Sequence, residues 1–163
     1  MHRIPIDVPL LQEKIVTSIL FTAIETDDGI TGYGLTRGAQ RFGLKEFINR
    51  EAGPFLRGKN PLESERIWNQ LYKQFNPRAQ TGMWSSAVSA IDIALWDIKG
   101  KHYREPVWRL LGGAQNPVQA YVTFGLKQYE KDQLVEVAKQ LVERGETRLK
   151  MVVAVDPENP KLD

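Results

Sequence analysis

The sequence predicts an α+β fold for its first part, an antiparallel sheet followed by a helical bundle, and the beginning of an α/β domain for its last part. Three observations support this prediction: a strand–turn–strand pattern near the N-terminus, a series of apolar stripes at helical spacing, and a strand–helix–strand pattern after Pro117. The boundary is expected between Gly112 and Pro117, which gives domains of residues 1–113 and 114–163.

The opening sheet is predicted from three extended segments. Residues 4–9 can form a short strand before a loop. Residues 16–26 are rich in β-branched and aromatic side chains, which is typical of a strand. Asp27-Asp28-Gly29 supplies the positive-φ positions that a tight hairpin turn needs, and residues 30–36 form the return strand.

Two helices are predicted after the sheet. Residues 44–56 place apolar side chains near one face, although Pro54 interrupts the pattern. Asn60 is a suitable N-cap and Pro61 suits the first helical position, so a second helix is expected to begin there and to continue to Phe75.

The third helix is expected to be buried. Residues 84–98 are apolar around most of the helical circumference, which indicates a helix packed between layers. Gly100 is expected to weaken or end it. Residues 106–111 then form one or two helical turns, closed by Gly112-Gly113.

The last part of the chain predicts a parallel βαβ unit. Residues 118–124 form a strand, residues 129–144 an amphipathic helix, and residues 148–155 a nearly continuous apolar strand. A parallel sheet of two strands cannot cover itself, so we expect a domain that is incomplete in this chain.

Composition excludes several classes of protein. The chain has 163 residues, a net charge of +2, and basic and acidic side chains that are interspersed, so no nucleic-acid partner is expected. Its apolar runs are far shorter than the ~20 residues of a membrane span. The N-terminus lacks a signal peptide, and the absence of cysteine excludes disulfides. We expect a cytoplasmic protein without a membrane partner.

The run from Ala87 to Gly113 is the most specific feature of the chain. It contains Asp-x-Ala-Leu-Trp-Asp-x-x-Gly-Lys, followed by Pro106-Val107 and then Leu-Leu-Gly-Gly. This run resembles the junction between the N-terminal capping domain and the barrel of the enolase superfamily, in its mandelate racemase/muconate lactonizing enzyme branch. The resemblance implies a capping domain over residues 1–113 and the first βαβ of an incomplete (β/α) barrel over residues 114–163.

The resemblance also implies a chemistry. Members of the family bind a carboxylate substrate on a divalent ion, usually Mg²⁺, and a base removes the proton α to the carboxylate. Racemases, epimerases, cycloisomerases and acid-sugar dehydratases share this step, and family members are commonly homo-oligomers. The acidic metal ligands of the family have no counterpart in this chain, so no metal ligand is expected within its 163 residues.

The family pattern assigns roles to a few residues. Lys150 matches the first lysine of the Lys-x-Lys pattern, which positions the substrate carboxylate, and it is the expected catalytic residue; a solvated lysine is the alternative. Val152 replaces the second lysine and cannot transfer a proton. Lys14, Arg37 and Arg41 fall where members contact the distal end of the substrate, although the two arginines could also be solvated loop charges.

Two aspartates in the junction run have a structural interpretation. Asp92 and Asp97 are five residues apart on the predicted helix, about 140° around its axis, so they cannot easily share a metal ion. We expect them to hydrogen-bond neighbouring backbone groups instead.

The leading functional hypothesis is the N-terminal part of a Mg²⁺-dependent enzyme that acts on a small carboxylate such as a sugar acid. The missing lysine at position 152 favours a dehydratase. A racemase, epimerase or cycloisomerase of the same superfamily is the alternative, and so is a non-catalytic truncated relative that serves as a binding or structural module. The 163-residue chain alone is expected to be inactive, because a complete barrel needs roughly 200 residues or more.

Overall fold

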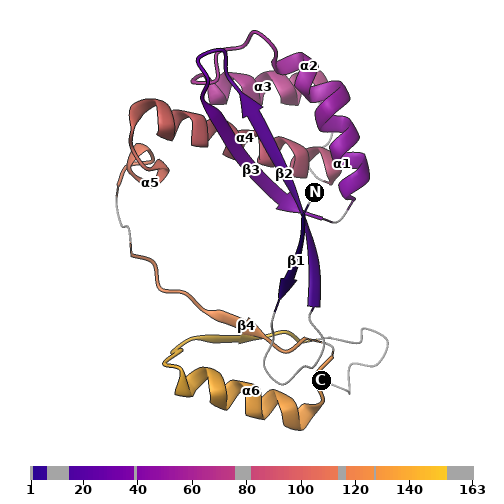
Figure 1. Ribbon diagram of the computed structural model, residues 1–163, viewed down its shortest axis with the longest axis vertical. Coiled ribbons are helices and arrows are strands. Elements are labelled where there is room, and N and C mark those ends of the chain that lie inside the picture. Colours follow the sequence, from indigo (N-terminus) through magenta and orange to yellow (C-terminus); the bar gives the residue numbers. More distant parts are fainter. Residues whose placement is uncertain are drawn as a thin grey trace. The chain divides into compact units, whose positions relative to one another are not determined.

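The computed structural model describes residues 2–6, 15–38, 40–75, 82–113, 117–126 and 128–153. The chain divides into two compact units. The first unit consists of Val16–Asn116 with Met1–Ile4, and the second of Pro117–Asp163 with Pro5–Ile15. Figure 1 shows the elements of both units.

A three-stranded sheet lies mostly in the first unit, to which His2–Ile4 and Val16–Arg37 of its strands belong. Strand β1 (His2–Ile6) neighbours β2 (Ile15–Glu25), which pairs antiparallel with β3 (Thr31–Arg37). The turn between β2 and β3 is closed by hydrogen bonds between Thr26 and Ile30, and Gly29 adopts a φ of 80°. The predicted hairpin is therefore confirmed, with bounds shifted by one residue.

A continuous helical segment follows the hairpin, formed by α1 (Arg41–Phe47), a π-helical turn (Ile48–Ala52) and α2 (Gly53–Leu56). It begins three residues before the predicted start. The π turn explains how the helix tolerates Pro54. The turn ends immediately before α2, so the proline lies in the first turn of α2, where its missing N–H costs little.

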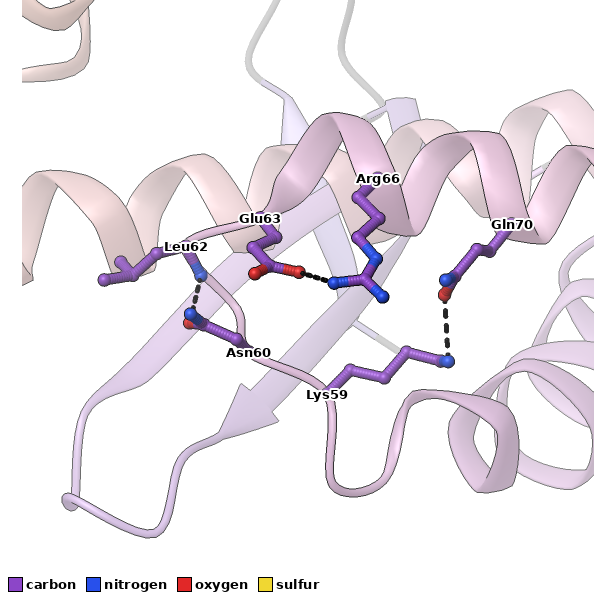
Figure 2. A network of polar contacts seen from close by, with 6 residues as sticks. All are labelled: Lys59, Asn60, Leu62, Glu63, Arg66 and Gln70. Carbon is purple, nitrogen blue, oxygen red and sulfur yellow. Dashed lines mark hydrogen bonds and ion pairs between the residues drawn. The ribbon is translucent and has the colours of Figure 1, made fainter.

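Helix α3 (Ser64–Phe75) begins later than predicted. The Asn60 side chain accepts the N–H of Leu62 at 3.0 Å, and its carbonyl accepts the N–H of Glu63 at 3.1 Å, so Asn60 and Pro61 form a turn before the helix (Figure 2). The predicted helix start at these residues is wrong because Asn60 caps this turn instead. Two contacts hold the turn to α3: Lys59 with Gln70 at 2.9 Å, and Glu63 with Arg66 at 2.8 Å.

Helix α4 (Met83–Tyr103) is the central helix of the first unit, and it passes through Gly100. The expectation that Gly100 weakens or ends the helix is wrong. The helix ends instead at Arg104, which has a φ of 56°, while the N–H of Glu105 donates to the Gly100 carbonyl at 3.0 Å. The short helix α5 (Val107–Leu110) follows. No helix in the described ranges is long and apolar enough to cross a membrane.

The core of the first unit lies between α4 and its neighbours on both sides. Helix α4 packs along the β2–β3 hairpin on one side and contacts α1 and α3 on the other (Figure 1). A Cβ atom on Gly32 or Gly34 would overlap the backbone carbonyls of Ala94 and Ala90, respectively. The two glycines therefore allow a close approach between strand β3 and the helix. The main buried cluster consists of Ala52, Ile67, Leu71, Val88, Ile91, Leu95 and Ile98.

The second unit contains β4 (Val122–Phe124), α6 (Lys131–Glu143) and β5 (Leu149–Met151). The two strands pair in parallel, and α6 begins with a capping box formed by Glu130 and Gln133. The predicted βαβ unit is confirmed. Both strands are shorter than predicted, since only three residues of each take part in the pairing.

Asp97 makes the backbone hydrogen bond expected of it. Its Oδ2 accepts the N–H of Tyr33 at 2.8 Å and the ammonium of Lys101 at 2.7 Å. Partial burial alone would raise the pKa of Asp97, but the hydrogen bonds from Lys101 and Tyr33 and the charge of Lys101 outweigh it and hold the pKa below its ordinary value. The pKa of Asp92 is raised by burial, which the charge of Lys99 only partly offsets.

We predict that Gly34→Ala destabilises the chain by about 1–3 kcal/mol, because the new methyl group would force strand β3 away from α4. Urea unfolding measures the change. Gly43→Ala is the matched control. Its methyl group would meet only the flexible side chain of Met83, at an exposed position of α1 where alanine favours the helix over glycine. Equal effects of the two substitutions would contradict the close approach.

We predict that Asp97→Asn reduces the loss of stability in acid. A carboxyl group whose pKa is lowered on folding stabilises the native state above the unfolded-state pKa, about 3.8, and loses this effect as the pH falls through the folded-state pKa. The free energy of unfolding of the parent should exceed that of the variant by about 0.5 kcal/mol at neutral pH. The difference is small because the Asp97–Lys101 ion pair is partly exposed. Urea unfolding at several pH values measures the difference. A gap that persists below the folded-state pKa would contradict the prediction.

Candidate functional site

Lys150 lies in the middle of strand β5, in the second unit. Its Cα pairs with that of Thr123 in β4, and its ammonium nitrogen lies 5.4 Å from the centre of the Tyr121 ring. The side chain is exposed. An exposed lysine over a ring face keeps its charge available to an anionic group.

The two faces of the β4–β5 sheet differ in burial. Val122, Phe124 and Leu149 are half-buried and share one face with Met151, which is exposed, while Thr123 and Lys150 are exposed and share the other. Helix α6, whose Val137 and Leu141 are buried, contacts β4, so it covers the half-buried face. Lys150 therefore lies on the face that α6 leaves open.

Val152 follows β5 and is placed by its backbone. Its N–H donates to the carbonyl of Phe124 at 2.9 Å, which continues the parallel ladder past Met151. Because side chains alternate along an extended strand, Val152 belongs to the same face as Lys150. The apolar side chain of Val152 is therefore the next one after Lys150 on this face of the sheet.

Arg37 and Arg41 lie at the end of the β2–β3 hairpin that is remote from its turn. Arg37 is the exposed last residue of β3, and Arg41 is the half-buried first residue of α1. The two are joined through Gly38, where a Cβ atom would overlap the carbonyl of Ser18, so this segment runs tightly against β2. The structure thus places two of the predicted substrate-binding residues on one short segment.

The guanidinium group of Arg41 is only partly satisfied. One terminal nitrogen donates to the Gly38 carbonyl at 3.4 Å, and the group lies 4.7 Å from the centre of the Phe42 ring. Its Nε is buried and has no hydrogen-bond partner among the described residues. A buried donor of this kind favours a ligand oxygen, because leaving it unpaired is costly.

The third predicted substrate-binding residue, Lys14, lies outside the described residues. Strand β2 begins at the next position, Ile15, and its antiparallel register brings Ile19 opposite Arg37. Ile15, where the described strand begins, therefore lies four residues along β2 from the position opposite Arg37.

The described residues do not supply a metal centre. They contain no group of three or more His, Cys, Asp and Glu side chains placed to hold an ion. Asp97 is engaged by Tyr33 and Lys101, and Asp92 lies on a different side of α4. A Mg²⁺ ion of the kind that the resemblance implies does not fit the carboxylates in this part of the chain.

The structure also contains a cleft that the sequence analysis missed. Its volume is about 790 Å³, and it lies beside the hairpin turn, at the opposite end of the hairpin from Arg37. Acidic residues of the turn line one part of it and Arg57, Lys59 and His102 line another. The sequence analysis assigned the acidic turn and Asn60-Pro61, which line it, to local structure only, and the basic residues come from segments that only the fold brings together.

The first two thirds of the chain match a known family model. Residues 5–112 match the N-terminal domain of the mandelate racemase / muconate lactonizing enzyme family. Among curated proteins, the chain is 38% identical over 122 residues to D-galactarolactone cycloisomerase from Agrobacterium fabrum, and 35% identical over 116 residues to arabinonate dehydratase from Saccharolobus solfataricus. The matched regions cover 74% and 70% of this chain, respectively.

Solved structures agree with these matches. A racemase from Streptomyces coelicolor with bound magnesium is similar with a TM-score of 0.76 and 28% identity, over 96% of this chain and 46% of that one. The 3,6-anhydro-D-galactonate cycloisomerase from Zobellia galactanivorans is similar with a TM-score of 0.72 and 36% identity, over 91% of this chain and 41% of that one.

The matches cover only part of each relative. The chain spans 32% of the cycloisomerase from Agrobacterium fabrum and 31% of the arabinonate dehydratase, about a third of their lengths. Within that third, the α+β arrangement of hairpin and helices agrees with the matched domain, as the resemblance of the junction run predicts. The chain belongs to the mandelate racemase/muconate lactonizing enzyme branch of the enolase superfamily, and its residues 5–112 match the N-terminal domain of that family.

Proposed function

We propose that this chain is the N-terminal part of an enzyme that removes the proton α to the carboxylate of a sugar acid and then expels the β-hydroxyl group as water. Residues 1–113 act as the capping domain, and residues 114–163 open a (β/α) barrel. The similarity to arabinonate dehydratase and to D-galactonate dehydratase from Klebsiella pneumoniae, 35% and 38% identical over the matched regions, supports this reading.

The parallel strand pair of the second unit supports a barrel segment. Among the described residues of this unit, α6 contacts the strand pair and no further strand is paired with it, and further strands of a barrel would cover its edges. In such a barrel the helices lie outside, so the face without α6 would line the interior. The proposed site depends on a single observation, which is that Lys150 lies on the face of the strand pair that α6 does not cover.

Lys150 would bind the carboxylate group of the substrate. Its ammonium is exposed and next to an aromatic ring, which leaves its charge available for a charge-assisted hydrogen bond to a carboxylate oxygen. Negative charge accumulates on that carboxylate when the α-proton leaves, so a fixed cation stabilises the transition state more than the ground state.

Val152 limits which reaction this face can catalyse. Valine has no proton to give or take, so this face offers a carboxylate-binding cation without a neighbouring base. The base then acts from a different strand. In a dehydration it takes the α-proton as H⁺, the C–H electron pair forms the enediolate, and that pair expels the β-hydroxyl group, which takes up a proton and leaves as water. The resulting enol becomes a 2-keto-3-deoxy acid.

The loop residues would contact the rest of the substrate. Arg37 and Arg41 lie on one segment at one end of the hairpin, and the Nε of Arg41, which has no hydrogen-bond partner among the described residues, is suited to a hydroxyl or carboxylate oxygen. Lys14 is included with them on the family resemblance alone. We propose that these residues select the distal end of the sugar acid.

The proposal includes Mg²⁺ and a homo-oligomer, as the family resemblance implies, and a cytoplasmic location, as the N-terminal sequence predicts. The described residues contain no group that could hold the ion, so its ligands would come from other residues of the whole protein. The solved racemase from Streptomyces coelicolor contains magnesium, which supports this cofactor for the whole protein.

A cycloisomerase is the second candidate. It is favoured by the 38% identity to the D-galactarolactone cycloisomerase and by the similarity to the solved cycloisomerase from Zobellia galactanivorans. Its product keeps every atom of the substrate, whereas a dehydratase loses one water.

We predict that the 163-residue chain alone shows no turnover with Mg²⁺ and sugar acids, and that the longer product of its reading frame does. The reason is that the described residues of this chain supply neither the metal ligands nor the base. The assay follows 2-keto acid formation and product mass over a panel of aldonates, aldarates and their lactones. Dehydration by the chain alone would contradict the capping role, while an isomeric product without loss of water would favour the cycloisomerase.

We predict that Lys150→Met in the longer protein lowers kcat/KM by about 100-fold or more, since a fixed group that orients the substrate contributes on that scale. Lys139→Met is the matched control, because Lys139 is an exposed lysine on α6 of the same unit and should leave kcat/KM unchanged. A fall of similar size in both variants, or in neither, would remove Lys150 from the site.

A further inference from the structure

Two side chains of helix α4 cap the free edge of strand β3. The N–H of Tyr33 donates to Oδ2 of Asp97 at 2.8 Å, and the ammonium of Lys101 donates to the Thr31 carbonyl at 2.6 Å. Asp97 and Lys101 also pair with each other at 2.7 Å. Among the described strands β3 stands at one end of the order β1-β2-β3, so these backbone groups face away from β2.

The capped edge has the properties of a template for another strand. In an antiparallel strand, alternate residues turn both backbone groups to the same edge, so Leu35 presents its N–H and carbonyl beside those of Tyr33. A row of such groups pairs readily with a strand of another chain. The side chains of Tyr33 and Leu35 are also about half exposed, at 54% and 50%, and would add apolar contacts to such a pair.

We propose that Asp97 and Lys101, the edge-capping pair, keep β3 from forming an antiparallel pair with β3 of a second copy of this chain. Two β3 strands that pair symmetrically about Gly34 would place Tyr33 opposite Leu35 and Arg37 opposite Thr31. Such a pair places apolar side chains opposite each other, and the strand residue opposite Arg37 is the uncharged Thr31, so the strand itself is compatible with pairing to its own copy.

The edge-capping pair opposes this association directly. An incoming strand would have to displace Asp97 from the Tyr33 N–H and Lys101 from the Thr31 carbonyl, and so would lose two charge-assisted hydrogen bonds for two neutral ones. The ammonium of Lys101 also lies 4.7 Å from the centre of the Tyr33 ring and so stands over a side chain of the paired surface. This gives a role to Asp97 and Lys101 of the junction run that the proposed reaction does not use.

The neighbouring pair of Glu105 and Arg109 provides a matched comparison. It has the same spacing of four residues, an N–O distance of 3.0 Å and a similar exposure, but no strand backbone group takes part in it. Removing it deletes a surface ion pair without uncovering an edge.

The test compares self-association of three forms of the whole chain by sedimentation velocity over a range of concentrations. The forms are the parent, the Asp97→Ala/Lys101→Ala variant, and the Glu105→Ala/Arg109→Ala control. We expect the dimer dissociation constant of the first variant to be at least about tenfold lower than that of the parent, which corresponds to about 1.4 kcal/mol. The control should match the parent, so association through any other surface cancels in the comparison.

A second substitution distinguishes edge pairing from general aggregation. Leu35→Lys, added to the Asp97→Ala/Lys101→Ala variant, places a charge on the exposed edge and should restore the behaviour of the parent. The proposal is wrong if the folded double variant associates no more than the parent, or if Leu35→Lys leaves its association unchanged. Should circular dichroism show that the double variant is unfolded, Lys101→Met alone, which frees the Thr31 carbonyl but leaves Asp97 on Tyr33, is judged by the same criteria.

Discussion

The close approach of helix α4 to the β2–β3 hairpin is the constraint on which the first unit depends. Gly32 and Gly34 lack the Cβ atoms that would collide with the carbonyls of Ala94 and Ala90. The strand and the helix touch through backbone at these positions, and the larger side chains of α4, such as Ile91, Leu95 and Ile98, join the main buried cluster, against which Ile24 and Ile30 of the hairpin also pack. The same approach brings Asp97 within hydrogen-bonding distance of the β3 edge.

This packing also fixes the position of the residues proposed to contact substrate. Arg37 ends the strand that α4 holds, and the segment through Gly38 leads directly into α1 and Arg41. The position of the arginines thus follows from the packing of β3 on α4, a contact that does not involve the arginines themselves. The cleft beside the turn belongs to the other end of the same hairpin, and the proposed reaction does not use it.

Sequence patterns predicted the elements of the fold better than their ends. The hairpin was found because Gly29 needs a positive φ, and the βαβ unit because the strand and helix patterns alternate after Pro117. The predicted helix ends were wrong where a residue type is compatible with more than one local structure. Asn60 caps a turn as readily as a helix, and Gly100 stays helical because the chain reverses at Arg104 instead.

The candidate site was predictable only in part, for a similar reason. The alternation of side chains along β5 puts Lys150 and Val152 on one face, and that can be read from their spacing. The exposure of that face and the unpaired Nε of Arg41 depend on contacts between segments distant in sequence, which no local pattern encodes. The cleft between the hairpin turn and the segment before α3 arises in the same way.

Amide hydrogen exchange of the whole chain tests the central packing contact most directly. If the hairpin and α4 form one cooperative structure, the amides of Thr22 and Gly34 in the hairpin and of Ile91 and Leu95 in the helix should exchange with the same free energy of opening. Exchange of the hairpin amides at a much lower free energy than those of α4 would show that the hairpin opens by itself, and would contradict the account.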